Sequence, residues 1–387
     1  MHRMTDRDDQ TRPASDRPIA SWEDVRRLQG MAGLAALTIN ARTLKFDGLL
    51  PVALRRAFAA VVPGGRITIL DEGRGCSEPP VLDLTFNQVR QTVLKFLGDG
   101  CELVELDPAG RITMRRTRPA LPRAWSAGVM YSGAAAEGPT LRRCLDALVA
   151  QPELAGDVGE IVVCGPSDGD RAFLSDYPGV RYLAVDGVED DHGRFLLAKK
   201  KNALIDALAH ARMVVLHARV VLAPDALSRV PAEFDILAPN IVRIRRNGNP
   251  EAYMSLAQID RPWPGYMLRR RTLMLRDVRG CDPLRLHAAG PCYVDGGAVF
   301  VTRPVFDRCR MDDRLGWAEG EDVDWCMRAF LAGFVSDLAV EARATSLTSK
   351  WTDHALPGAV EQLARRATGL VQQWRGRLRH IARPSLR

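Results

Sequence analysis

Acidic side chains gather at residues 319–324, where the sequence reads Glu-Gly-Glu-Asp-Val-Asp at the start of an expected helix that ends at Gly333. A carboxylate can accept a proton from a reacting hydroxyl group, which is the role of a general base. Acids in the first turn of a helix also complement the helix dipole without doing any chemistry. The residues alone favour this structural role for Glu321 and Asp322, so the surrounding sequence has to decide.

Basic side chains end an apolar stretch, MVVLHARVVL, at residues 213–222. We predict a strand that ends at His217 and Arg219, before a turn at Pro224. The planar guanidinium of arginine donates hydrogen bonds in a fork that matches phosphate. Upstream, the run of three lysines that ends at Lys201 is typical of a solvated face, although Lys201 would suit a diphosphate. The pattern favours an anionic ligand at the end of the strand.

The elements that would position these residues alternate between strand and helix from about residue 126. Apolar runs and helical spacing predict strands over 127–133, 159–168, 180–186 and 213–220, and helices over 139–151 and 196–211. Such alternation is typical of an α/β domain with a mostly parallel sheet. Ligands bind these sheets at the carboxyl ends of the strands. Ser132, Asp168 and His217 lie at such ends.

The region before this domain has a different pattern. We predict a strand that enters a loop over 34–44, a helix over 49–61, a turn and strand over 62–73, a helix over 86–97 and a hairpin over 101–116. The whole chain is then expected to divide into a disordered leader (1–30), an α/β module (31–118), a Pro-rich linker (119–125), the α/β domain (126–355) and a basic amphipathic helix (356–387).

Composition narrows the class of protein. The chain has 387 residues, of which 46% are hydrophobic and 26% charged, and this excludes a disordered or fibrous protein. Its apolar runs are far shorter than the roughly 20 residues that cross a bilayer, and its polar beginning predicts no secretory signal. Eight cysteines without a CxxC pair predict free thiols in a reducing cytoplasm. Despite a net charge of +7, no nucleic-acid-binding motif is present, so we expect no nucleic-acid partner.

Between residues 126 and 350 the order of these elements resembles the GT-A fold glycosyltransferases, and most closely their family 2 group. The similarity is carried by four stretches: VMYSGAAAEGPTLRRCLDAL, KKKNALIDALAHARMVVLHAR, DGGAVFVTR and GWAEGEDVDWCMRA. The last is the most specific, because it resembles the Gly-Glu-Asp-x-Asp signature of that family.

This resemblance implies an inverting transfer of a sugar from a nucleotide donor, expected to be UDP-linked, to an acceptor hydroxyl. Asp322 would be the general base, with Glu321 as its neighbour. The acceptor would be a glycan or a lipid-linked molecule, and the carboxy-terminal helix could contact a membrane surface. The implied donor-binding residues are Ser132, Asp168, Lys201, Asn202, His217 and Arg219, and the implied acceptor-binding residues are Asp295, Gly296 and Gly297.

The sequence departs from the family at one decisive place. The register that sets Lys201 and Asn202 on the preceding helix puts His217 and Arg219 where the family has an Asp-x-Asp motif for a divalent cation. Neither side chain replaces a carboxylate ligand of a hard cation, and the last segment offers only His354. We expect no metal site, with Arg219, aided by Lys201, taking the place of the cation. The alternative is an inactive homologue that acts as a binding or scaffold protein.

Residues 31–118 bear a second resemblance, to the back half of a class I methyltransferase that uses S-adenosylmethionine. A helix, a Pro-Gly-Gly turn and a strand follow one another, and the hairpin over 101–116 would match the last strands of that fold. A Gly-x-Gly loop, which lets the backbone approach the cofactor, is missing. The resemblance therefore implies a truncated, non-catalytic module, and an independent α+β domain is the alternative.

Overall fold

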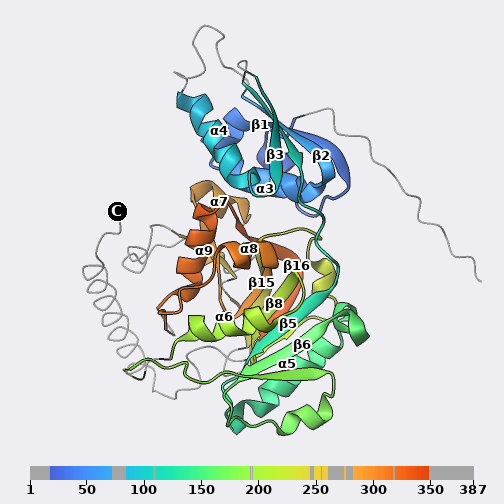
Figure 1. Cartoon of the computed structure of the whole chain (residues 1–387), viewed down its shortest axis with the longest axis vertical. Helices are drawn as coiled ribbons and strands as arrows, with labels where there is room; N and C mark the ends of the chain where they lie inside the picture. Colours follow the sequence, from blue (N-terminus) through green and yellow to red (C-terminus); the bar gives the residue numbers. More distant parts are fainter. Residues whose placement is uncertain are drawn as a thin grey trace, which may run out of the picture. The chain divides into compact units, whose positions relative to one another are not determined.

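The computed structural model describes residues 18–71, 84–107, 110–191, 193, 195–244, 248–253, 255–259, 274–275, 282–316 and 319–347 (Figure 1). The chain forms two compact units, Met1–Ala120 and Leu121–Arg387, and each is described by itself. The division falls within the predicted linker. The predicted helix over 356–387 lies outside the described residues.

The first unit is a four-stranded sheet with helices. Its elements are α1 (Trp22–Leu28), β1 (Leu34–Asn40), α2 (Ala41–Phe46), α3 (Leu50–Ala60), β2 (Val61–Leu70), α4 (Leu84–Leu97), β3 (Cys101–Asp107) and β4 (Arg111–Arg116). The strand order is β1-β2-β4-β3, with β1 and β2 parallel and the other pairs antiparallel. The hairpin expected over 101–116 is β3 and β4. Alternate residues of the strands are buried, including Ile67, Ile69, Ile112 and Met114.

Two helices of this unit differ from the expectation. Helix α1 lies inside the expected leader, where Ser21 and Asp24 form a capping box and Val25 and Leu28 are buried. A capping box satisfies backbone donors at a helix start, which explains why a helix forms in so polar a segment. Helix α2 replaces the expected loop after β1, because Ala41 and Leu44, three residues apart, are buried on one side.

The second unit has an α/β fold, as predicted, but its main sheet is mixed instead of mostly parallel. In the described residues four strand pairs are parallel and four are antiparallel, because the predicted strand–helix alternation covers only the first half of the sheet. The main strands are β5 (Trp125–Met130), β6 (Glu160–Gly165), β7 (Val180–Ala184), β8 (Arg212–His217), β9 (Val220–Leu222), β10 (Ile236–Ile244), β11 (Pro250–Ala252), β15 (Ala298–Thr302) and β16 (Ser336–Ser346). Their order is β7-β6-β5-β8-β15-β10-β16-β9, and β11 pairs with β10. Strands β5, β6, β7 and β8 are parallel to one another, and so are β10 and β16. Strand β15 is antiparallel to both β8 and β10, and β9 is antiparallel to β16.

The helices and short strands of this unit complete the fold. The helices are α5 (Gly138–Val149), α6 (Leu197–Ala207), α7 (Leu284–Ala289), α8 (Arg303–Arg308) and α9 (Glu321–Leu331). Single turns of 3-10 helix occur at Ala135–Glu137, Pro152–Leu154, Gly156–Val158, Ala172–Asp176 and Leu227–Arg229. A small separate sheet has the order β13-β12-β14, with β12 at Leu256–Gln258, β13 at Met274–Leu275 and β14 at Cys292–Val294.

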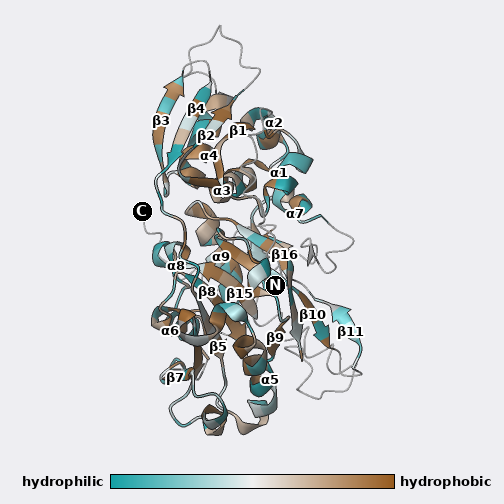
Figure 2. Cartoon of the chain, turned by 90° about the vertical axis from the view of Figure 1, so that its right-hand side faces the viewer, coloured by the Kyte–Doolittle hydropathy of each residue, from teal (hydrophilic) through white to brown (hydrophobic). Residues whose placement is uncertain are grey.

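Alternate residues of β8 enter two different cores. Met213 and Val215 pack with α6, α8 and α9, whereas Val214 and Leu216 pack with α5. Because both faces of the strand are covered, its apolar run is continuous rather than alternating. Figure 2 shows this as brown colour on the central strands. Among the described residues, no helix combines the length and the apolar character that crossing a membrane requires.

Candidate functional site

The end of β8 meets a glycine turn that precedes β15. The N–H of His217 donates to the carbonyl of Gly297 at 2.9 Å, which continues the antiparallel pairing of β8 with β15 by one residue. The next residue, Ala218, donates its N–H to the carbonyl of Met130 at the end of β5. The basic end of β8 is therefore fastened to strands on both of its sides.

Asp322 is held against the same turn. Its Oδ2 accepts the N–H of Gly296 at 2.8 Å, and its Oδ1 accepts the N–H of Val323 at 2.9 Å. Helix α9 starts here because Gly320, its N-cap, adopts a left-handed conformation with φ of 76°, which glycine allows at little cost. Asp322 is only 9% exposed. Two backbone donors from different elements thus fix one carboxylate.

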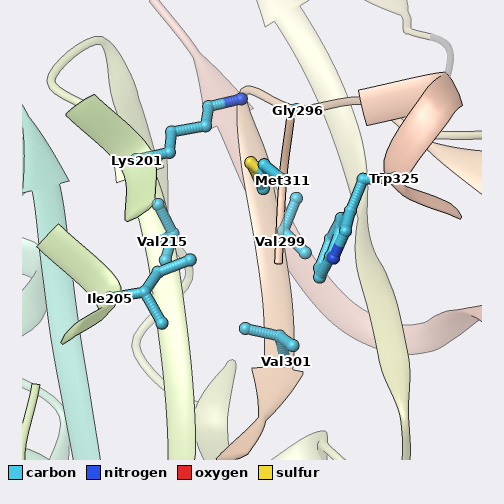
Figure 3. Close-up of a pocket in the computed structure, with 8 residues that line it drawn as sticks. All are labelled: Lys201, Ile205, Val215, Gly296, Val299, Val301, Met311 and Trp325. Carbon is cyan, nitrogen blue, oxygen red and sulfur yellow. The ribbon is translucent and has the colours of Figure 1, made fainter. Parts of the chain in front are cut away.

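A buried ion pair lies beside this carboxylate. The Nζ of Lys201 is 2.9 Å from Oε1 of Glu321, and their side chains are 1% and 7% exposed. Figure 3 shows the Lys201 side chain reaching from α6 to the backbone at Gly296. A Cβ at Gly296 would lie 2.6 Å from this Nζ and 3.1 Å from Oδ2 of Asp322. A side chain at residue 296 would therefore displace the Lys201 ammonium from its present place.

The basic side of the site is built around Arg219. Its Nη1 is 2.9 Å from Nδ1 of His217, and its carbonyl accepts the N–H of Leu347. A Cβ at Gly297 would lie 2.8 Å from Oδ1 of Asp295 and 3.4 Å from Nη2 of Arg219. The turn at Gly296 and Gly297 thus has the acids of α9 near one residue and the guanidinium near the other.

Most of the predicted site residues meet at this turn. Those that the structure brings together are Lys201, His217, Arg219, Asp295, Gly296, Gly297, Glu321 and Asp322. Ser132 lies in the loop after β5, where Glu137 accepts both its N–H and its O–H. Asp168 is exposed in the loop after β6. Neither has a described contact with the turn.

Two residues expected to bind the donor are packed inside the unit. Lys201 has its ammonium in the ion pair with Glu321, and Asn202 both donates to the carbonyl and accepts the N–H of Met311. The cause is that α6 lies between the sheet and the segment around Met311, so this part of the helix faces inward. Asn202 therefore fastens the chain instead of facing a ligand.

The sequence did not indicate Lys200 or Tyr253. Lys200 is buried and donates to the carbonyl of Tyr131 at 2.6 Å, and burial lowers the pKa of Lys200 below its ordinary 10.5. Tyr253 donates its O–H to Oδ2 of Asp295 at 3.2 Å. The lysine run is typical of a surface, and Tyr253 follows β11 in a stretch without periodicity. No sequence signal singles out either residue.

A small cavity lies below the ion pair. Figure 3 shows it between α6, β8, β15 and α9, with Lys201 and Gly296 at one end and apolar side chains such as Trp325 around the rest. The centre of a water molecule has about 10 Å³ of room there. This is the volume that roughly one water needs, so the cavity cannot hold a sugar or a nucleotide.

The residues at this site do not fit a divalent cation. Mg²⁺ and Mn²⁺ prefer oxygen ligands, but the end of β8 carries His217 and Arg219. In the described part of the chain, no cluster of three or more histidine, cysteine or acidic side chains could hold a metal ion. The guanidinium would in addition repel a cation, whereas it suits an anion.

Comparisons with known proteins found distant structural similarities. Neither a protein-family model nor a curated protein matches it. Solved structures do. TarS residues 1–349 from S. aureus has a TM-score of 0.39 and 11% identity, over 58% of this chain and 60% of that one. GalNAc-T7 with UDP, GalNAc and Mn²⁺ has a TM-score of 0.42 and 15% identity, over 74% and 56%.

A third solved structure is the mannosyltransferase PcManGT from Pyrobaculum calidifontis with GDP-Man and Mn²⁺. Its TM-score is 0.38 and its identity 16%, over 66% of this chain and 64% of that one. All three likenesses are distant. The second unit itself has a mixed α/β architecture around a central sheet. The chain spans less than two thirds of the length of each of the three structures.

Proposed function

We propose that the second unit is a family 2-like glycosyltransferase that moves a hexose from a nucleotide donor, UDP-linked as the sequence resemblance implies, to an acceptor hydroxyl. The observation that carries the proposal is the turn at Gly296 and Gly297, where a fixed carboxylate, Asp322, and a guanidinium, Arg219, meet at the carboxyl end of β8, a strand parallel to β5. This is the edge at which α/β sheets bind ligands. The acceptor is proposed to be a glycan or a lipid-linked molecule in polysaccharide assembly in the cytoplasm, with the residues after 355 contacting the membrane surface.

The reaction assigns a role to each of these two side chains. The acceptor oxygen attacks the anomeric carbon from the face opposite the nucleotide, and Asp322 accepts the proton that this oxygen loses. The bond from the anomeric carbon to the diphosphate oxygen breaks, and the electron pair stays on the diphosphate. The configuration at the anomeric carbon is thereby inverted.

Arg219 stabilises the departing diphosphate in this proposal. The negative charge that develops there needs a positive partner, and preorganised donors supply such stabilisation in many enzymes. Lys201 is too deeply buried in its ion pair to share this role by direct contact. The proposal is therefore a metal-independent transfer in which the guanidinium of Arg219 takes the place of a metal ion.

The test measures transfer and donor hydrolysis by the purified protein with a panel of UDP-sugars, with and without EDTA. Asp322→Asn should abolish turnover and leave UDP binding intact, because only the proton acceptor is lost. Asp324→Asn, on the same helix and ion-paired with Arg328, is the matched control and should keep turnover. Full activity of Asp322→Asn would rule out the assigned base, and a requirement for Mn²⁺ would rule out the metal-free step.

A binding or scaffold protein is the alternative function. The observation that favours it is the presence of His217 and Arg219 at the end of β8, where the sequence resemblance expects two acids. It predicts UDP binding, measured by thermal shift, without any turnover on any donor. UDP-sugar consumption that depends on Asp322 would contradict it.

For the first unit we propose a truncated methyltransferase-like module without catalytic function. The hairpin of β3 and β4, which follows α4 and lies beside β2, supports this proposal because the resemblance expects such a hairpin at the end of the fold. S-adenosylmethionine at millimolar concentration should therefore leave the melting temperature unchanged. A saturable increase would contradict the proposal.

A further inference from the structure

Asp295, which the sequence resemblance assigns to acceptor binding, faces the protein. It is 4% exposed. Its Oδ1 accepts the N–H of Gly297 at 2.9 Å, and its Oδ2 accepts the O–H of Tyr253 at 3.2 Å. Its own N–H donates to the carbonyl of Ser255. Both carboxylate oxygens are thus used inside the protein, and the side chain joins the glycine turn to the segment that follows β11.

The turn that Asp295 holds is in contact with both halves of the proposed site. The N–H of Gly296 donates to Asp322, and the carbonyl of Gly297 accepts the N–H of His217. The ring of His217 contacts the guanidinium of Arg219 in turn. A shift of this dipeptide would therefore change the position of the carboxylate relative to the guanidinium.

Glycine by itself would not keep this geometry. Glycine has the largest backbone freedom of all residues, and two of them in sequence need an external restraint to stay in one conformation. The Gly297 N–H to Asp295 bond has a charged acceptor, and such bonds are stronger than hydrogen bonds between neutral groups. Tyr253 fixes the other oxygen, so the carboxylate itself is held in one orientation.

We propose that Asp295 is a positioning residue: by holding the Gly296–Gly297 turn, it sets the place of Asp322 for proton transfer and of Arg219 for diphosphate binding. The proposal rests on the proposed glycosyltransferase function and deepens it. A misplacement of about 1 Å at a reacting group can cost roughly 100-fold in rate. Loss of the restraint should therefore reduce turnover and nucleotide affinity together, although Asp295 touches neither substrate.

The experiment compares Asp295→Ala, Asp295→Asn and Tyr253→Phe with the unchanged protein. Alanine removes the acceptor of the Gly297 N–H, whereas asparagine keeps an oxygen at that place. Three quantities are measured on each protein: kcat with a UDP-sugar that the unchanged protein consumes, the Kd for UDP, and amide hydrogen exchange of the peptide that contains residues 292–300. Exchange in helix α3 of the first unit serves as the internal control.

We expect Asp295→Ala to lower kcat at least 10-fold, to weaken UDP binding several-fold and to raise exchange in the 292–300 peptide. Asp295→Asn should have a kcat, a Kd for UDP and an exchange rate close to those of the unchanged protein. The values for Tyr253→Phe should lie between those of Asp295→Asn and Asp295→Ala. A merely structural role would lower the melting temperature but leave kcat per folded molecule and the Kd for UDP unchanged, and this result would overturn the proposal. Equal exchange in Asp295→Ala and the unchanged protein would overturn it too.

The same measurements distinguish an error in the proposed function from an error in this inference. If the unchanged protein neither binds UDP nor consumes any UDP-sugar, the glycosyltransferase proposal is wrong. The exchange measurement then still decides whether Asp295 restrains the turn, because it needs no ligand. If the unchanged protein is active and Asp295→Ala keeps both its kcat and its UDP affinity, only the positioning role is wrong.

Discussion

The ammonium of Lys201 on α6 and the carboxylate of Glu321 at the start of α9 form a buried ion pair 2.9 Å long, between residues 120 apart in the sequence. Removing one partner of such a pair leaves a buried charge without compensation and typically costs about 3 to 5 kcal/mol. In a unit of this size each kcal/mol changes the melting temperature by roughly 2 to 4 °C.

We therefore predict that Lys201→Met and Glu321→Leu each lower the melting temperature of the second unit by roughly 6 °C or more. The double variant should be more stable than either single variant, because apolar residues of similar volume can replace a buried ion pair at little cost. Differential scanning calorimetry measures all three. Additive losses in the double variant would show that the two side chains do not depend on each other.

Arg219 should decide the affinity for a diphosphate. Hydrogen bonds between charged groups contribute about 1.5 to 3 kcal/mol, so Arg219→Ala should weaken UDP binding by roughly 10- to 100-fold. Arg219→Lys should recover only part of this, because a lysine lacks the fork. Isothermal titration calorimetry gives the Kd values. Arg229→Ala, at an exposed arginine paired with Asp225, is the control and should bind UDP normally.

Gly296→Ala should damage the site directly. The added methyl group would lie 2.6 Å from Nζ of Lys201, and relieving such overpacking typically costs about 1 to 3 kcal/mol. We expect a lower melting temperature and reduced turnover. Gly138→Ala is the matched control, because a Cβ there meets nothing within 4 Å. If Gly296→Ala keeps full activity and stability, the turn is looser than its contacts indicate.

The carboxylate of Glu160 at the start of β6 predicts a pH dependence of stability. Burial raises its pKa, but hydrogen bonds from Ala209 and Ser126 and the ion pair with Arg181 outweigh this and leave the pKa below the ordinary 4.5. A depressed pKa in the folded state means stabilisation that is present above pH 4.5 and is lost as the pH falls through the folded value.

Glu160→Gln should therefore be less stable than the unchanged protein at pH 7, and the difference should shrink as the pH falls below 4.5. Urea unfolding at a series of pH values measures it. A difference that stays constant down to pH 3 would mean that the charge of Glu160 contributes nothing.

The six cysteines among the described residues are all buried free thiols. Burial raises the pKa to about 12 for Cys144 and Cys326 and to about 11 for Cys101 and Cys164. Because the thiolate is the reactive form, these cysteines should resist iodoacetamide at pH 8 in the native protein and react fully in guanidinium chloride. Peptide mass spectrometry locates the label, and rapid native labelling of Cys144 would contradict its burial.

The fold was predictable where local patterns agree with tertiary packing. The apolar run of β8 and the acid-led start of α9 both appear where the sequence indicated them. Burial on two faces and a helix start each produce a recognisable pattern within a few consecutive residues. The sequence of helix α1 also contains a local signal, the capping box of Ser21 and Asp24. The segment is so polar, however, that the apolar face of the helix could not be recognised from the sequence.

The sequence predicted which residues belong to the candidate site better than it predicted the role of each residue. Lys200 and Lys201 belong to a basic run of the kind that usually lies in water, and what buries them is the packing of α6 on distant elements. The partner of Lys201 is at residue 321, and that of Asn202 is at residue 311. No local pattern encodes such pairings. Whether Asp322 is a base and whether Arg219 binds a nucleotide stay predictions.

The fastening of Ala218 to β5 and of Arg219 to Leu347 has a consequence for ligand recognition. Ordering a long side chain on binding costs about 0.5 to 1.5 kcal/mol of entropy. Arg219 is held through its backbone and by the ring of His217 before any anion arrives, so little of that entropy remains to be lost. An anion at this place would therefore meet a guanidinium that is already held in position. Most of the conformational entropy lost on binding would then be lost by the ligand.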